Sequence, residues 1–365
     1  MKQEIEIRPD SIRDILLIAN NIVPKKTLLP ILDNICLIIK NGVLTVRAGS
    51  LETQVTMKVE LNGVEDDFSA AVPAATFCNV LNSLQVDKLK IIKDDNKVMI
   101  KSGKNKYSMP VYNVDEYPIL HLVNPSEPIR IDGEVLSRYI KKASMLTNPS
   151  DVRPAMCSIN LEVVGSEFFV MGTDAHQGGV LSIPSTGSIE STLISRDAGG
   201  IMQLIKFNGP TTISKGKDSI EIVCGSTSIV SRVVEAKYVP LLAQFKNKKE
   251  GFVTVSKTDM TEAMGRIKLF TNIESHRVDL TVEGNEITIK AFNENTGKEA
   301  QEVINCTNNG VVDISLGFNI QFLFNMFNLI DSVEVNMHIT EINRPIYFNA
   351  SGDNVREFYL SLPMV

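Results

Sequence analysis

The stretch SIRDILLIAN (residues 11–20) carries apolar side chains at positions 12, 15, 16 and 19. Steps of three and four residues place these side chains on one stripe of an α-helix. The same stripe begins at residue 136 in EVLSRYIKKA (134–143) and at residue 260 in DMTEAMGRI (259–267), an interval of 124 residues each time. One helix is therefore predicted three times at a fixed spacing.

A second series of helical stripes lies between the first three. These stripes begin at Phe77, Ala198 and Ile320, which are 121 and 122 residues apart. Near-constant spacing between unlike sequences indicates one domain plan used three times. The six helices are expected at 11–23, 74–84, 132–147, 195–207, 256–271 and 318–330.

The segments between the helices alternate between apolar and polar residues. Clear examples are GVLTVRA (42–48), NEITIKA (285–291) and SVEVNMHI (332–339). A period of two predicts strands with one covered face. Pairs such as Asn41-Gly42 and Ser351-Gly352 mark turns between them. The fold class is therefore α+β with antiparallel sheets, and we expect both helices of each third to pack on one face of a single sheet.

The domain boundaries follow from the same interval. The segment 115–128 contains three prolines, and 236–251 contains a similar Tyr-x-Pro stretch about one repeat later. We expect three domains, at 1–122, 123–247 and 248–365. A chain of 365 residues is also too long for one ordinary hydrophobic core.

Composition narrows the functional classes. The N-terminus is charged, and no apolar stretch reaches membrane-spanning length, so we expect a cytoplasmic protein. The five cysteines have no disulfide or metal-site spacing and are interpreted as thiols of a reducing compartment. They are Cys36, Cys78, Cys157, Cys224 and Cys306.

Positive charge is concentrated in the predicted helices. They hold nine basic and six acidic residues, a net +3, whereas the rest of the chain is net −9. A solvated outer face is the ordinary explanation of such a pattern. A surface for phosphates, bound without reading bases, is the functional alternative. The candidate phosphate contacts are Lys25, Lys26, Arg138, Lys141, Lys142, Arg196, Lys206, Lys257, Arg266 and Lys268.

The stretch GTDAHQGG (172–179) resembles the floor of an active site. Asp174 and His176 could form an acid–base pair, with Ser182 or Ser195 as the nucleophile. No G-x-S-x-G elbow accompanies them, and no phosphate-binding glycine loop occurs in the chain. We therefore expect no catalytic residues and no cofactor.

A metal site is not expected either. Asp174 and His176 supply two ligands at most. The remaining histidines lie in separate repeats, at His121, His276 and His338.

Several motifs, taken in order, resemble the bacterial β sliding clamp family, the processivity subunit of DNA polymerase III. They are KTLLPILDNI (26–35), DVRPAM (151–156), GTDAHQGG, HRVDLTVEGNEITIKAFN (276–293), GKEAQEVI (297–304) and YLSLPMV (359–365). That family has three copies of a two-helix, sheet-backed domain. The resemblance implies a non-enzymatic protein, built as a head-to-tail homodimeric ring with helices lining the hole and sheets outside.

The resemblance also implies partners and sites. A clamp encircles double-stranded DNA without sequence preference and tethers DNA polymerase and clamp-loader subunits through short apolar peptides. The implied peptide groove is Met156, Thr173, Ala175, His176, Gly178, Pro240, Phe245, Leu360, Leu362, Pro363 and Met364. The implied dimer contact joins Lys104, Lys106, Tyr107 and Met109 to Leu269, Phe270, Glu299 and Glu302.

This chain departs from the family pattern around the groove. Gln177 and Gly178 stand where a basic residue and a large aliphatic residue are usual, and Gln244 stands where a basic residue is common. Pro154 and Ala155 replace a frequent aromatic pair. We expect a wider groove or a different peptide preference. A three-repeat scaffold protein without a DNA role is the alternative function.

Overall fold

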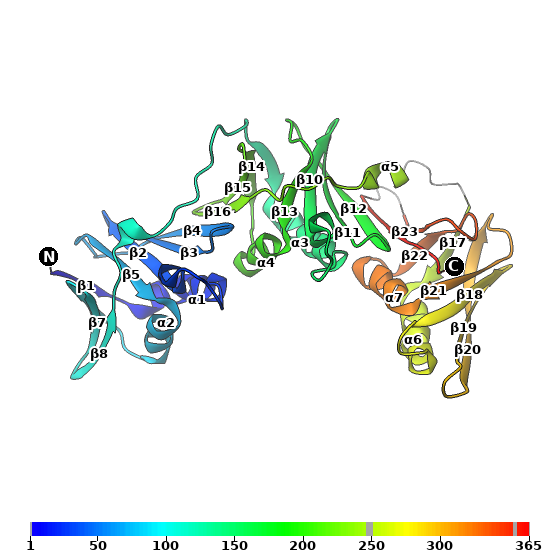
Figure 1. Ribbon diagram of the computed structural model, residues 1–365, viewed down its shortest axis with the longest axis horizontal. Coiled ribbons are helices and arrows are strands. Elements are labelled where there is room, and N and C mark those ends of the chain that lie inside the picture. Colours follow the sequence, from blue (N-terminus) through cyan, green and yellow to red (C-terminus); the bar gives the residue numbers. More distant parts are fainter. Residues whose placement is uncertain (1, 246–250, 353–355, 365) are drawn as a thin grey trace. The chain divides into compact units, whose positions relative to one another are not determined.

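The computed structural model describes residues 2–245, 251–352 and 356–364 (Figure 1). The chain divides into two compact units, each of which is described by itself. Unit 1 comprises Met1–Arg138, Ser185–Ile189 and Asp197–Val233. Unit 2 comprises Tyr139–Pro184, Glu190–Arg196 and Val234–Val365.

Within the described residues, the chain passes three times through one order of elements: a strand, a helix, four strands, a helix and three strands. Repeat 1 contains β1 (Gln3–Ile7), α1 (Arg13–Ile22), β2 (Asn34–Lys40), β3 (Val43–Gly49), β4 (Thr53–Glu60), β5 (Phe68–Pro73), α2 (Ala74–Ser83), β6 (Leu89–Asp94), β7 (Lys97–Ser102) and β8 (Asn105–Pro110). Repeat 2 contains β9 (Ile129–Asp132), α3 (Gly133–Met145), β10 (Ser158–Val164), β11 (Glu167–Thr173), β12 (Gln177–Pro184), β13 (Thr192–Ser195), α4 (Arg196–Ile205), β14 (Pro210–Lys215), β15 (Ser219–Cys224) and β16 (Thr227–Arg232). Repeat 3 contains β17 (Phe252–Ser256), α6 (Lys257–Ile267), β18 (Arg277–Glu283), β19 (Glu286–Asn293), β20 (Lys298–Asn309), β21 (Ile314–Asn319), α7 (Ile320–Leu329), β22 (Glu334–His338), β23 (Ile346–Ala350) and β24 (Glu357–Ser361).

All six predicted helices are present, and their apolar stripes face the core. In α1, Leu16 and Ala19 are buried, and in α3 the four stripe residues from Leu136 to Ala143 are buried. The N-terminus of α6 is capped by the Ser256 hydroxyl, which accepts a hydrogen bond from the Asp259 amide. A short helix, α5 (Leu241–Phe245), was not predicted, because five residues are too few to display a helical period.

The expectation of one sheet in each third was wrong. The strands of repeat 1 form two four-stranded sheets, ordered β5-β2-β3-β4 and β1-β6-β7-β8. The corresponding strands of repeats 2 and 3 are ordered in the same way. In repeat 3, α6 contacts β17 from one sheet and β19 and β20 from the other. Alternation along a strand shows that one face is covered, but it does not show which strands pair.

Neighbouring repeats share their sheets through one kind of join. In unit 1, β4 of repeat 1 pairs antiparallel with β16 of repeat 2. In unit 2, β12 of repeat 2 pairs antiparallel with β24 of repeat 3. The joined sheet of unit 1 therefore has eight strands and lies beside the separate sheet β1-β6-β7-β8, whereas the joined sheet of unit 2 has twelve because β17 also pairs with β20.

The strand predictions hold with one correction. Leu44, Val46 and Ala48 are buried in β3, and their counterparts are buried in β19. Val333 was placed on the buried face of its strand, but its side chain is 83% exposed and it lies before β22 begins. The pair Asn41 and Gly42 forms a turn with positive φ angles of 50° and 73°.

The domain boundaries remain a prediction. The first, at 122, lies between β8 and β9. The second, at 247, lies outside the described residues. No helix in the described part of the chain is long and apolar enough to cross a membrane.

Candidate functional site

The GTDAHQGG stretch is the turn between β11 and β12. Oδ1 of Asp174 accepts hydrogen bonds of 2.8 Å from the backbone amides of both His176 and Gln177, and Oδ2 accepts one of 2.9 Å from the Gln177 side chain. The Thr173 hydroxyl donates to the Gln177 carbonyl at 2.6 Å. Ala175 has a φ of 76°. Asp174 therefore closes a tight turn, with both carboxylate oxygens occupied.

His176 extends from this turn toward repeat 3. Its ring stacks on Phe322 of α7, with the ring centroids 6.0 Å apart. Its carbonyl accepts a hydrogen bond of 2.8 Å from the Leu362 amide in the C-terminal tail. The imidazole of His176 therefore stacks on α7 and the His176 carbonyl holds the C-terminal tail, while Asp174 bonds to the neighbouring backbone. This geometry is that of a turn and not of an acid–base pair.

An apolar cluster covers the sheet where repeats 2 and 3 join. Its buried members come from β11, β12, α5, β23 and β24, and are Met171, Val180, Leu241, Tyr347 and Leu360. Phe245, at the end of α5, packs against the cluster, with its ring 5.6 Å from that of Tyr347 and 6.3 Å from that of Phe358. The Tyr347 hydroxyl donates to the Gln244 carbonyl at 3.1 Å, which fixes α5 against β23.

A second cluster adjoins the first through Tyr238. It consists of Ala155, Met156 and Leu193, with Val234, Ala236 and Tyr238 packed against it. Tyr238 belongs to both clusters, and burial raises the pKa of its hydroxyl. The two clusters form one apolar region of unit 2, which we call the groove surface because it lies where the family resemblance implies a peptide groove.

The predicted groove residues occupy three neighbouring positions. Met156, Thr173, Gly178, Phe245 and Leu360 lie in or beside the two clusters, and Pro240 directly precedes α5. Ala175, His176 and Leu362 lie around the β11–β12 turn. Pro363 precedes Met364, whose amide donates to the Gly317 carbonyl at 2.7 Å. Sequence reasoning missed Met171, Val180, Tyr238, Leu241 and Tyr347, although the run YVPLLAQF (238–245) was the available signal.

The extra width expected at Gly178 is absent. A Cβ atom at Gly178 would lie 3.0 Å from the Cδ1 atom of Leu241, so the α5 leucine already fills that space. Gln177 is turned away from the groove surface, because its amide bonds to Asp174 and to Asn325 of α7. The departures from the family pattern therefore change which side chains line the surface, without enlarging it at this point.

A charged pair lies beside the β11–β12 turn. The Arg153 guanidinium bonds to both carboxylate oxygens of Asp151, at 2.9 and 2.8 Å. These hydrogen bonds, followed by one from the Arg153 amide, lower the pKa of Asp151 to about 2.

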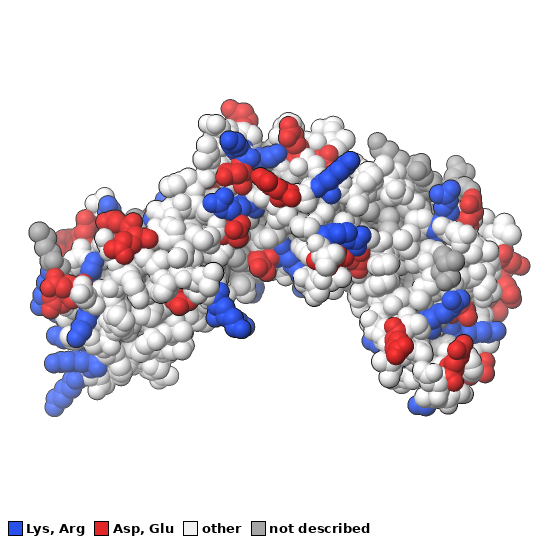
Figure 2. All heavy atoms as spheres, viewed as in Figure 1, with Lys and Arg blue, Asp and Glu red and all other residues white. Residues whose placement is uncertain are grey.

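Most of the predicted phosphate contacts are exposed, and some of the ten also have contacts within the fold. The exposed ones are Lys25, Lys26, Arg138, Lys141, Lys206, Arg266 and Lys268. Arg196 donates to the Thr147 carbonyl at 3.2 Å, and Lys257 donates to the Ile330 carbonyl at 2.6 Å. Arg266 forms a two-point ion pair with Glu302, at 2.6 and 2.8 Å. In the view of Figure 2, basic and acidic side chains are mixed on the visible surface.

Lys142 is wrong as a phosphate contact. Its ammonium group lies 2.7 Å from Asp331 and 2.6 Å from Glu357, and the residue is only 6% exposed. The helical period points Lys142 toward the sheet, whereas its neighbour Lys141 faces solvent. A group already neutralised and buried cannot meet a phosphate from solution.

The predicted dimer residues lie on β8 and the turn before it, on β20, and on a short 3-10 helix. Lys104 and Lys106 are exposed and Tyr107 is half-buried, and β8 is the last strand of its sheet. The Met109 side chain is a correction, because it is 5% exposed and packs inside its own repeat. Leu269 and Phe270 belong to the 3-10 helix Lys268–Phe270, and Glu299 and Glu302 belong to β20.

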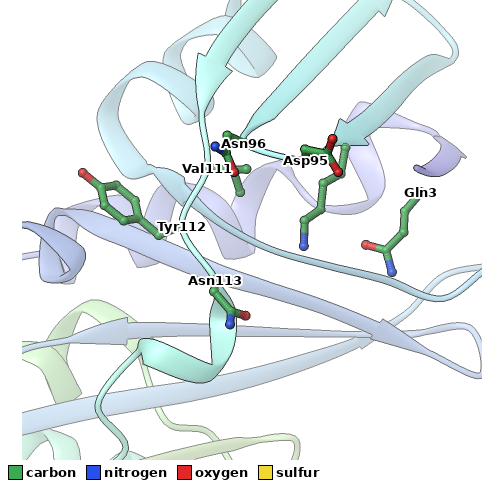
Figure 3. A pocket seen from close by; sticks show the side chains of 7 residues that line it. Gln3, Asp95, Asn96, Val111, Tyr112 and Asn113 are labelled. Atoms are coloured by element: carbon green, nitrogen blue, oxygen red, sulfur yellow. The ribbon is translucent and has the colours of Figure 1, made fainter. Parts of the chain in front are cut away.

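A recess in unit 1 is lined by polar residues of β1 and of the β6–β7 turn, together with residues 111–113 (Figure 3). Its side chains are used within the fold. The Lys93 ammonium donates to the Ser69 carbonyl at 2.7 Å, and the Gln3 side chain accepts from the Ser69 amide at 3.2 Å. Tyr112 pairs with Ala71 through the backbone. These contacts protect the outer edge of β5.

Comparison with known proteins assigns the family. The model of the N-terminal domain of the DNA polymerase III beta subunit matches residues 3–121, and the model of its C-terminal domain matches residues 245–364. Together they cover more than half of the chain. The chain belongs to the DNA polymerase III beta subunit family, the bacterial β sliding clamps.

The relatives are distant but span nearly the whole chain. The beta sliding clamps of Pseudomonas putida and Pseudomonas aeruginosa are 22% and 23% identical to it, each over 96% of both chains. The clamp of Escherichia coli is 21% identical over 86% of both. A sliding clamp from Pseudomonas aeruginosa solved with griselimycin superposes over 100% of both chains with a TM-score of 0.93 and 21% identity. The three-repeat clamp fold is thus retained at low identity.

Membership in this family settles the class of protein. Beta sliding clamps are non-catalytic processivity subunits of a DNA polymerase, and the chain is a replication protein of that kind and not an enzyme. The turn at Asp174 and His176 belongs to the fold of a clamp.

Proposed function

We propose that this chain closes into a head-to-tail homodimeric ring around duplex DNA, by pairing β8 of one copy with β20 of the other. The observation that carries the proposal is that both joins between repeats pair the same two strands of the repeat. In each join, the fourth strand of one sheet (β4, β12) pairs with the last strand of the next repeat (β16, β24). By the same rule, the partner of β20 is a strand equivalent to β16 and β24. That strand is β8, which ends its own sheet.

Within the described residues of one chain, β8 and the first part of β20 each have a strand edge with no neighbouring strand, which suits this pairing. Lys298 to Asn305 of β20 pair with β19 on one side, and β17 takes only residues from Cys306 onward on the other. Exposed strand edges are prone to pair with another chain. A heterologous contact that closes on itself leaves no free edge at the seam. Two copies give six repeats, the number in the ring that the family resemblance implies.

The repeats also supply a register for the seam. The residues equivalent to Ala300 in the other two repeats are Val55 and Gly179. Each of the three pairs with the residue at the same position of the preceding strand in its sheet. In the joins these pair with Ile229 and Tyr359. The equivalent of Ile229 in β8 is Tyr107, because Ile222 faces Ile229 as Ile100 faces Tyr107. Ala300 is therefore placed opposite Tyr107, and Gln301 opposite Lys106.

A cysteine pair tests this register. We expect the double variant Lys106→Cys/Gln301→Cys to form a covalent dimer on mild oxidation, seen on a non-reducing gel. Directly opposed residues in antiparallel strands have Cα atoms about 4.5–5.5 Å apart, within disulfide reach. Both native residues are exposed, so their replacement should leave the fold intact.

The matched control is Lys106→Cys/Asn305→Cys. Asn305 is also exposed but lies four residues farther along β20, or about 13 Å away. Cross-linking that is equal in both double variants would contradict the register. Cross-linking in neither, with the protein monomeric, would contradict the ring.

DNA binding is proposed to rest on exposed Lys and Arg side chains of the helices and the loops that follow them. Such contacts to phosphates are sequence-independent and interchangeable, which permits sliding. Function then comes from topology, because a polymerase tethered to the ring has a high effective concentration at the primer end. The groove surface, with its apolar body and polar edge, is suited to capture short apolar peptides of the polymerase and clamp loader.

A salt titration tests the DNA contact of α3. We expect Lys141→Ala to weaken binding to a labelled duplex and to reduce the slope of log K against log salt concentration by up to about 0.9, the value for one phosphate contact. The control is Lys97→Ala, which removes an exposed lysine from β7 instead of from a helix. Equal slopes for Lys141→Ala and the parent protein would show that Lys141 of α3 does not contact the DNA.

A further inference from the structure

An ion cluster around the buried Lys142 ties repeat 2 to repeat 3 behind the groove surface. The Lys142 ammonium of α3 donates to Asp331, just after α7, at 2.7 Å and to Glu357 of β24 at 2.6 Å. The Tyr359 hydroxyl donates to the same Glu357 oxygen at 2.7 Å. Burial, and then the adjacent Glu357 carboxylate, raise the pKa of Tyr359, so that its hydroxyl stays protonated and able to donate.

The strand β24 presents its two faces to different structures. Leu360 is part of the groove cluster, and the ring of Phe358 lies 6.3 Å from that of Phe245. Glu357 and Tyr359 alternate with these residues and bond on the opposite face, toward α3. A Cβ atom at Gly179 of β12 would lie 2.8 Å from the Tyr359 ring, so the two strands approach closely here.

Lys142 leaves β24 little freedom of position. A buried ammonium is very costly unless it is paired and hydrogen-bonded, and both of its carboxylate partners belong to repeat 3. A shift of β24 along β12 would separate the buried Lys142 from Glu357 and leave it only the more exposed Asp331 as a partner. The ion cluster therefore penalises any other alignment of the two strands.

We propose that Lys142 is a positioning residue of the groove: it holds β24 from behind and thereby sets where Phe358 and Leu360 stand against α5. The groove surface is built from both repeats, so its shape depends on how they are joined. The peptide-binding role of that surface rests on the proposed function. The positioning role does not, and it can be measured without any peptide.

A tryptophan reporter tests the proposal directly. The chain has no native tryptophan, so Phe245→Trp introduces a single emitter that packs against Tyr347 and Phe358. We expect Lys142→Met in this background to shift the emission to longer wavelength as β24 moves away. We also expect amide hydrogen exchange in β24 to accelerate by at least about tenfold, as local opening becomes easier, while β18 and β19 are unchanged.

The matched control is Lys141→Met, which removes the neighbouring, solvent-facing lysine of the same helix. It should leave both the emission and the exchange unchanged. Adding Glu357→Gln to Lys142→Met removes the carboxylate left unpaired, and should restore part of the exchange protection.

Two outcomes would overturn the proposal. Unchanged emission and exchange in Lys142→Met would show that β24 is held without the ion cluster. Acceleration spread evenly over all of unit 2 would show a role in overall stability and not in positioning. A groove that keeps its shape but binds no partner peptide would contradict the proposed function alone.

Discussion

Replacing Leu269 with aspartate should convert the proposed ring into soluble monomers. Leu269 is 75% exposed in the isolated chain, next to the free part of β20, so a large apolar side chain there is available for the seam. Loss of one buried apolar anchor from an interface costs about 2 kcal/mol or more, and an introduced charge adds its own desolvation cost. We therefore expect the dissociation constant of each seam to rise by at least about 30-fold.

The measurement is the native mass, by light scattering or sedimentation, over a range of protein concentrations. Retention on circular duplex DNA should be lost in parallel, since an open ring slides off or never closes. The double variant with Phe270→Asp should be stronger, but Phe270 is half-buried and the single variant separates dimer loss from unfolding. Val333→Asp is the matched control, because Val333 is also largely exposed and lies outside both β8 and β20. A stable Leu269→Asp dimer would mean that the seam lies elsewhere.

Removing the chain after Leu360 should abolish binding of partner peptides while leaving the ring closed. The deletion takes away Leu362, whose amide bonds to the His176 carbonyl, and Met364, whose amide bonds to the Gly317 carbonyl. It also removes apolar side chains from the edge of the groove surface. We expect at least about a 30-fold loss of affinity, the effect of removing one anchor residue from an interface.

The experiment compares fluorescence anisotropy of labelled apolar peptides from the polymerase and clamp loader with the native mass of the same sample. A milder deletion after Ser361 is the better-controlled variant, because Ser361 is buried and ends β24 by pairing with Gln177 and Ile346. Both deletions should retain the mass of the dimer, since β8 and β20 are untouched. Loss of the dimer would show that the tail is structural, and unchanged peptide affinity would place the groove elsewhere.

The sequence by itself determined the repeated plan of this protein. The six helices and most strands could be located because burial on one side of a helix or strand leaves a local period, and the interval of 121 to 124 residues then reveals the repeat. The stretch GTDAHQGG also stood out in the sequence, but as a possible active site and not as a turn. The role of this stretch could not be predicted from the sequence, because a turn and an acid–base pair use the same residue types.

The tertiary structure alone decided how these local elements combine. The division of each repeat into two sheets depends on strand pairings within the repeat, such as β1 with β6, and the joins of β4 with β16 and β12 with β24 pair residues more than 100 positions apart. The same holds for individual side chains. Lys142 was predicted as a phosphate contact, but its ammonium group is paired with Asp331 and Glu357. Gly178 was predicted to widen the groove, but Leu241 fills the space beside it. A local period reports that a side chain is covered, but only the fold determines what covers it.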